Sequence, residues 1–158
     1  MVTERKAGRF VATILAASLA ALVTATSVSA REPPRTEQEL IERVRTAITA
    51  RDLDAISELI NWDGAATMKR RIVNFQVRYS LGRPIRSVVL EPFPEGGLRE
   101  IEARGTLKAN MPVTHRLRIV FDDAGDDGVE PASVFLIGKT DDGFRIALIV
   151  QAKPRDSD

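Results

Sequence analysis

Three side chains in this sequence offer groups suited to acid–base chemistry. His115, the single histidine, alternates with Val113 and Leu117, so it points to the apolar side of an expected strand. A histidine facing a pocket could act as a general base because imidazole titrates near neutral pH. Asp63 could serve as an alternative carboxylate base, and the Tyr79 hydroxyl could donate a hydrogen bond to a substrate. The alternative is a histidine satisfied in the core or at an interface.

The only tryptophan, Trp62, stands beside Asp63 where a short helical segment ends before Gly64. One interpretation places Trp62 in a pocket wall, with Asp63 accepting a hydrogen bond from a ligand. The other is structural, with Trp62 filling the core and Asp63 capping the next helix. Both interpretations stay open, and the candidate ligand-binding residues are Trp62, Asp63, Tyr79 and His115.

No spacing of metal ligands or cofactor motif is present. The chain has one His and no Cys, and the acidic loop at 122–130 lacks the ligand spacing of a calcium-binding EF-hand. We therefore expect no metal and no cofactor. The 23 basic residues nearly balance the 22 acidic ones, which argues against a nucleic-acid partner. Four basic residues near position 70 are interpreted as a solvated helix face: Lys69, Arg70, Arg71 and Arg78.

The first thirty residues have the pattern of a secretory signal peptide. Basic residues precede an uncharged apolar run at 10–30, which ends in small residues at Ala30. We expect cleavage after Ala30 and a periplasmic or secreted protein without stable membrane insertion. The alternative is an uncleaved membrane anchor.

The mature chain is expected to comprise a leader at 31–35, one domain at 36–152 and a flexible tail at 153–158. Apolar spacing predicts helices at 36–50, 52–60 and 65–82. Thr36 and Asp52 are expected N-caps, and Gly82 is expected just after the third helix. In that helix four apolar residues form a continuous stripe, which predicts a packing face with only the Tyr79 hydroxyl wet: Met68, Ile72, Phe75 and Tyr79.

The second half predicts an antiparallel sheet of about five strands, at 85–93, 98–111, 113–121, 133–139 and 144–153. A hairpin is expected at 140–143 because Asp-Asp-Gly is a strong turn signal. Three N-terminal helices followed by a run of strands indicate an α+β fold.

This element order, with the stretch ARDLDAISELINWDG at 50–64, resembles the nuclear-transport-factor-2-like superfamily, which includes ketosteroid isomerase-like and SnoaL-like domains. The resemblance implies a cone-shaped α+β roll with a pocket between helices and sheet, often dimeric through the sheet. It implies no single function, since members include enzymes, ligand binders and interaction modules. The catalytic set of the isomerases is incomplete here, because Tyr79 is the only tyrosine and no Asp lies in the apolar centre of a strand.

We therefore expect an exported, non-enzymatic domain that binds a small apolar or amphipathic molecule or a protein partner. One alternative is an isomerase or dehydratase-like lyase, which requires His115, Tyr79 and Asp63 to converge in one cavity. Another is a structural homodimer that pairs through the outer sheet face, where four charged residues are expected: Arg116, Arg118, Glu100 and Glu102.

Overall fold

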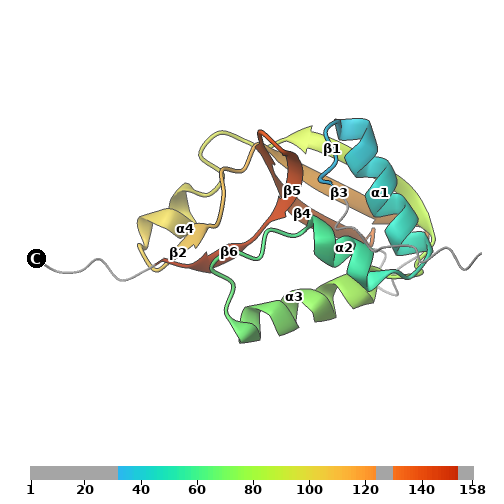
Figure 1. Ribbon diagram of the computed structural model, residues 1–158, viewed down its shortest axis with the longest axis horizontal. Helices are drawn as coiled ribbons and strands as arrows, with labels where there is room; N and C mark the ends of the chain where they lie inside the picture. Colours follow the sequence, from blue (N-terminus) through green and yellow to red (C-terminus); the bar gives the residue numbers. More distant parts are fainter. Residues whose placement is uncertain (1–31, 124–129, 153–158) are drawn as a thin grey trace, which may run out of the picture.

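The computed structural model describes residues 32–123 and 130–152. The expected signal peptide, the centre of the acidic loop and the C-terminal tail lie outside these ranges. Within them the protein is α+β (Figure 1). The helices are α1 (Glu37–Thr49), α2 (Leu53–Leu59), α3 (Thr67–Ser80) and α4 (Arg99–Ala103), and the strands are β1 (Ile85–Pro92), β2 (Leu107–Ala109), β3 (His115–Phe121), β4 (Ala132–Thr140), β5 (Gly143–Ala147) and β6 (Ile149–Gln151).

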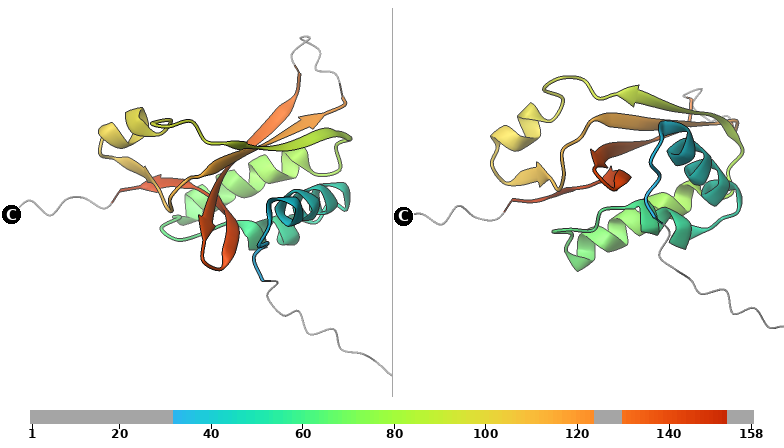
Figure 2. Two further views of the ribbon diagram at one scale, coloured as in Figure 1. Left: turned by 90° about the horizontal axis from the view of Figure 1, so that it is seen from above. Right: turned by 45° about the horizontal axis from the view of Figure 1, so that its top comes forward.

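The main sheet is antiparallel, with the strand order β1-β3-β4-β5, so β1 and β5 form its two edges. β2 and β6 pair separately as a two-stranded ribbon. Helices α1, α2 and α3 all lie on one face of the main sheet, as the left view of Figure 2 shows. The described part of the chain is thus two layers, helices on an open sheet, and contains no helix long and apolar enough to cross a membrane.

The core fills the space between the two layers. Alternate residues of β3 point into it, and the side chains of Leu117, Ile119 and Phe121 are fully buried. Leu40 and Val44 of α1 meet them from the helical side. Apolar burial of this kind is the main stabilising term of such a fold. Every residue of this core cluster lies between Leu40 and Val150.

The predicted helix and turn signals are found where the sequence places them. Thr36 accepts a hydrogen bond from the Glu39 N–H, and Asp52 accepts one from the Ala55 N–H, so both residues are N-caps. The Glu39 carboxylate does not reach back to Thr36. It accepts from the Arg35 N–H and pairs with Arg43, and these contacts, in that order, lower the pKa of Glu39.

The two expected backbone turns also form. Gly82 follows α3 with a φ of 75°, a left-handed conformation that favours glycine. The β4–β5 hairpin closes with Thr140 opposite Gly143.

The predicted packing face of α3 is wrong. Val73, Val77 and Ser80 are buried against the rest of the protein, whereas the Met68 and Phe75 side chains are 63% and 74% exposed. Val73, Val77 and Ser80 also repeat at helical spacing, so the helix carries two stripes. The stripe of smaller side chains packs into the protein, and the stripe of larger side chains faces solvent.

Two strand predictions are also corrected. The segment expected as the second strand instead forms α4 and then the short β2, because Arg99–Ala103 consists of residues that favour a helix. Glu100 and Glu102 consequently lie on α4 rather than on the sheet. The expected last strand divides at Leu148 into β5 and β6, which pair in different sheets.

Candidate functional site

His115 lies at the start of β3, beside the N-terminus of α1. Its Nδ1 is 2.9 Å from the Thr114 hydroxyl, and its Nε2 is 3.6 Å from the Glu37 carboxylate. The ring meets Phe144 edge-on at 6.0 Å. Both ring nitrogens therefore have polar neighbours within the chain, and the surroundings favour a role in joining α1, β3 and β5.

Trp62 is half-buried at the corner between α2 and α3. Its indole N–H donates to the Ser57 carbonyl over 3.0 Å, which occupies its only polar group. The Arg70 guanidinium lies 5.2 Å from the ring centroid and also donates to the Trp62 carbonyl. The ring packs against the core cluster, so these contacts match the structural interpretation of this residue.

Asp63 does not cap α3. The N-cap is Ala66, which makes no side-chain capping bond, and Asp63 is exposed in the preceding turn. The Asp63 carbonyl accepts from the Asn110 amide, which also donates to the Asn61 carbonyl and accepts from the Leu148 N–H. Asn110 thereby joins the α2–α3 corner to the division between β5 and β6. We did not single it out from the sequence, where it falls inside the strand expected at 98–111.

Tyr79 is 70% exposed at the C-terminal end of α3. Its ring lies 4.9 Å from the Arg83 guanidinium, which binds both carboxylate oxygens of Asp123. This ion pair raises the pKa of Arg83 and lowers the pKa of Asp123, in each case chiefly through the hydrogen bonds between the two side chains.

The four candidate residues therefore do not form one site. Trp62 and Asp63 lie at the start of α3, and Tyr79 lies at its end. His115 contacts α1 and β5 instead. The hollow lined by Tyr79 contains none of the other three. The convergence that an acid–base enzyme needs is absent from this arrangement.

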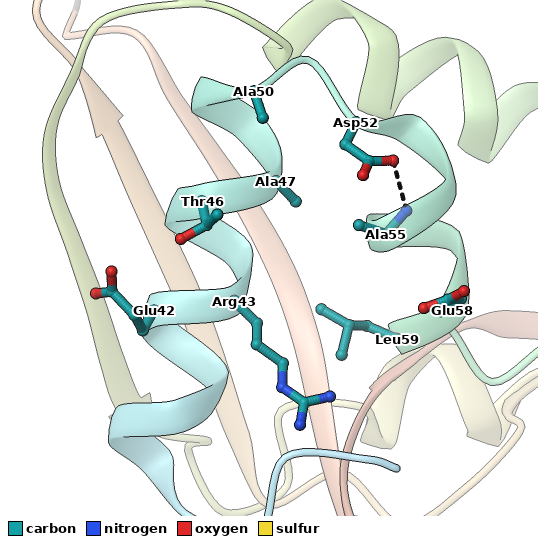
Figure 3. A pocket seen from close by; sticks show the side chains of 9 residues that line it. All are labelled: Glu42, Arg43, Thr46, Ala47, Ala50, Asp52, Ala55, Glu58 and Leu59. Carbon is teal, nitrogen blue, oxygen red and sulfur yellow. Dashed lines mark hydrogen bonds between the residues drawn. The ribbon is translucent and has the colours of Figure 1, made fainter. Parts of the chain in front are cut away.

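A separate hollow lies between α1 and α2, where Ala47 and Ala55 leave space between the helices (Figure 3). Two of its polar side chains have partners within the chain. Asp52 caps α2, and Arg43 bonds with Glu39 and with the Glu32 carbonyl. Glu42, Thr46 and Glu58 also line the hollow, which includes none of the four candidate residues, and we treat it as a packing gap between two helices. Among residues 32–123 and 130–152, no cluster of three or more His, Asp or Glu side chains could hold a metal ion.

The outer face of the sheet carries ion pairs within the chain. Arg116 pairs with Glu91 across β1 and β3, and Arg118 pairs with Glu130. Arg86 joins the same network through Glu130 and Asp122. Each of these pairs is exposed and adds little stability. The charges of this face are matched internally and do not require a second subunit to neutralise them.

The most unusual surface is the outer side of α3. We call its four exposed apolar side chains the α3 ridge: Met68, Ile72, Phe75 and Tyr79. At about 100° per residue the ridge occupies a strip roughly 60° wide, centred roughly 135° from the buried face. The helix runs along the lower edge of the molecule in Figure 1, so the ridge faces outward.

Shallow hollows flank both ends of the ridge. One lies between α3 and β4, and the other lies between α3 and the β2–β6 ribbon. The second is lined by apolar groups of Leu107, Ile149 and Val150 in addition to Met68 and Ile72. The apolar surface thus continues from the helix onto its neighbours.

Basic residues border the ridge. On a helical projection Arg71 and Arg78 lie beside it on one side, and the half-buried Lys69 lies farther from it on the other side. The segment Thr67–Ser80 contains no acidic residue. Among the described residues, neither these three nor Arg70 forms an ion pair, whereas Arg83, Arg86, Arg116 and Arg118 all do.

Comparisons with known proteins found no match to this chain among family models, curated proteins or solved structures.

Proposed function

We propose that this protein is an exported binding module that carries out no reaction itself and binds its partner through the α3 ridge. The observation that carries the proposal is the exposure of Phe75 and Tyr79, at 74% and 70%, beside Met68 and Ile72. Single exposed apolar residues are ordinary, but a contiguous row bordered by charge is typical of an interaction surface. Export is supported by the signal-peptide pattern at 1–30.

The partner is an amphipathic molecule or a protein with an apolar patch. The ridge offers aromatic and aliphatic contact, and the hollows at its two ends add the side chains of Phe135 and Leu107. Polar groups able to fix the orientation of a small polar substrate are sparse on this surface. Gln76 and Ser133 line the first hollow, and Lys69 and Gln151 line the second. The Ser133 hydroxyl is already bonded to Ser80. This balance favours contact by apolar area over recognition of a specific polar substrate.

We further propose that the domain is a divergent cone-shaped roll of the nuclear-transport-factor-2-like kind. Its first three helices precede an antiparallel sheet and lie on one face of it, as the resemblance implies. The space between helices and sheet is filled by buried core residues, including Leu117, Ile119 and Ile137. This filling supports a binding surface on the outside of α3 in place of an internal pocket.

Native mass spectrometry tests the proposal on protein that begins at Arg31, purified gently from an exported preparation. We expect a bound mass that is lost on denaturation and is absent from Phe75→Ser. Val89→Ser is the matched control, because Val89 is also exposed but lies on β1, away from α3. A clean polypeptide mass in every preparation rules out a small, tightly held ligand.

A second measurement covers weaker or larger partners. Trp62 is the only tryptophan, and its ring contacts Arg70 of α3, so its fluorescence reports on this helix. We expect dodecylphosphocholine below its micellar concentration to shift the Trp62 emission in the wild type and in Val89→Ser. Phe75→Ser should lose that response. An equal response in all three proteins, or no response in any, would contradict binding at the ridge.

A further inference from the structure

We propose that the α3 ridge docks on the surface of an anionic lipid bilayer, with the apolar side chains entering the interface and the basic borders contacting lipid phosphates. This inference rests on the proposed function, which assigns binding to the ridge but leaves the chemical class of the partner open.

The first argument is charge. Lys69, Arg71 and Arg78 border the ridge, Thr67–Ser80 contains no acid, and none of the three forms an ion pair among the described residues. A helix with an apolar face and basic flanks is typical of segments that lie in the plane of an anionic membrane surface. Anionic headgroups attract such residues over about a Debye length.

The second argument is shape. Met68 and Tyr79 mark the two ends of a straight row that spans roughly 16 Å along one helix, at about 1.5 Å per residue. The helix that carries the row lies at the edge of the molecule (Figure 1), and all four side chains are exposed. A projecting row suits a planar partner, whereas a small ligand needs a cavity that buries most of its surface. Tyr79 also suits the headgroup level, since its ring is apolar and its hydroxyl is polar.

The third argument is against a second copy of this chain. If two α3 helices pack ridge to ridge about a two-fold axis, antiparallel helices place the Arg71 and Arg78 border against itself. Parallel helices place that border against Lys69. Either arrangement brings like charges together, which is destabilising. An anionic surface neutralises both borders at once.

Vesicle sedimentation tests the inference, with protein that begins at Arg31. The apolar run at 10–30 is omitted because such a run binds lipid by itself. The omission leaves the core intact, since the whole core cluster lies between Leu40 and Val150. Thermal melting by circular dichroism verifies that each variant is folded.

We expect binding to vesicles of equal phosphatidylglycerol and phosphatidylcholine, little binding to pure phosphatidylcholine, and release by high salt. Arg71→Glu should lower the partition coefficient by about tenfold or more, because each basic charge near such a surface contributes roughly a factor of five. Phe75→Ser should lower it by about tenfold as well, through lost apolar burial. Arg99→Glu and Val89→Ser, which change an arginine and an exposed apolar residue away from α3, should bind as the wild type does.

The other outcomes overturn the inference in distinguishable ways. Equal binding to neutral and anionic vesicles that Phe75→Ser abolishes keeps the ridge as a binding surface but removes the anionic headgroup. Binding that Arg71→Glu and Arg99→Glu reduce equally assigns it to overall charge and not to α3. A wild-type dimer in sedimentation equilibrium that Phe75→Ser converts to a monomer assigns the ridge to a second copy. No binding to either vesicle rejects the lipid partner and leaves the proposed function to its own tests.

Discussion

The hydroxyl groups of Ser80 and Ser133 lie 2.8 Å apart and join the buried face of α3 to β4. Ser80 is 1% exposed and Ser133 is half-buried, so this polar contact lies at the edge of the core. It helps to fix which side of α3 meets the sheet, and therefore which side carries the ridge.

Replacing either serine of this pair should destabilise the protein, and replacing the second one should then cost less than it does alone. Ser80→Ala leaves the Ser133 hydroxyl without this partner, and we expect a loss of about 1 kcal/mol in the free energy of unfolding. The double change of Ser80 and Ser133 to Ala should cost less than the sum of the two single changes. Urea unfolding of the four proteins gives the coupling energy. Additive losses would show that the hydrogen bond contributes nothing.

The two stripes of α3 should respond differently to truncation. Val77→Ala removes buried methyl groups and should cost roughly 2 kcal/mol of stability. Phe75→Ser removes a larger side chain from an exposed position and should change stability by less than about 0.5 kcal/mol. Thermal and urea unfolding of both variants test this. A large loss in Phe75→Ser would mean that the ridge is covered in the free protein.

The Arg83–Asp123 pair predicts an acid-dependent loss of stability. Because the pKa of Asp123 is lowered in the folded state, its ionised form stabilises the fold. This contribution is complete above the ordinary carboxyl pKa of about 4 and is lost as the pH falls through the lowered value. Melting temperatures between about pH 6 and pH 2 should therefore fall less steeply for Asp123→Asn than for the wild type. Asp63→Asn controls for the loss of an exposed carboxylate, and parallel curves for Asp123→Asn and the wild type would contradict the prediction.

Two glycines with positive φ angles should tolerate alanine to different degrees. A Cβ at Gly143 would lie 2.5 Å from the Pro34 carbonyl oxygen, in addition to the strain of a φ of 137°. We expect a loss on the order of 2–3 kcal/mol there. At Gly105, with a φ of 68°, a Cβ meets nothing within 4 Å, so only the backbone strain of about 1 kcal/mol applies. Equal losses at the two sites would show that the approach of Pro34 is unimportant.

Sequence reasoning succeeded where the decisive interactions are local. Thr36 and Asp52 each accept a hydrogen bond from the N–H group three residues further along the chain, and the β4–β5 turn requires only its own residues. The α+β class follows from the order of such elements. The buried face of α3 could not be predicted in this way, because periodicity identifies an apolar stripe but not the surface that the stripe contacts. The stripe of Val73 and Val77 is as regular as that of the ridge.

The candidate site was harder to predict, since it depends on contacts between distant segments. The type of His115 is suited to a site, but its neighbours, Glu37 and Phe144, belong to α1 and β5 and are set by the packing of the fold. The same holds for α4. Ile101 and Ala103 fit an alternating strand as well as a helix, so the pattern alone does not decide between them.

The hydrogen bond from the Phe144 N–H to the Pro34 carbonyl joins the segment before α1 to the β4–β5 hairpin. Contacts of such long sequence separation slow folding, because a large loop must close before they form. Because the chain is synthesised from its N-terminus, α1 has no complete set of packing partners until β5 has been made. Until then the apolar side chains of α1 stay accessible to chaperones, and the timing of folding is set by completion of the C-terminal strands.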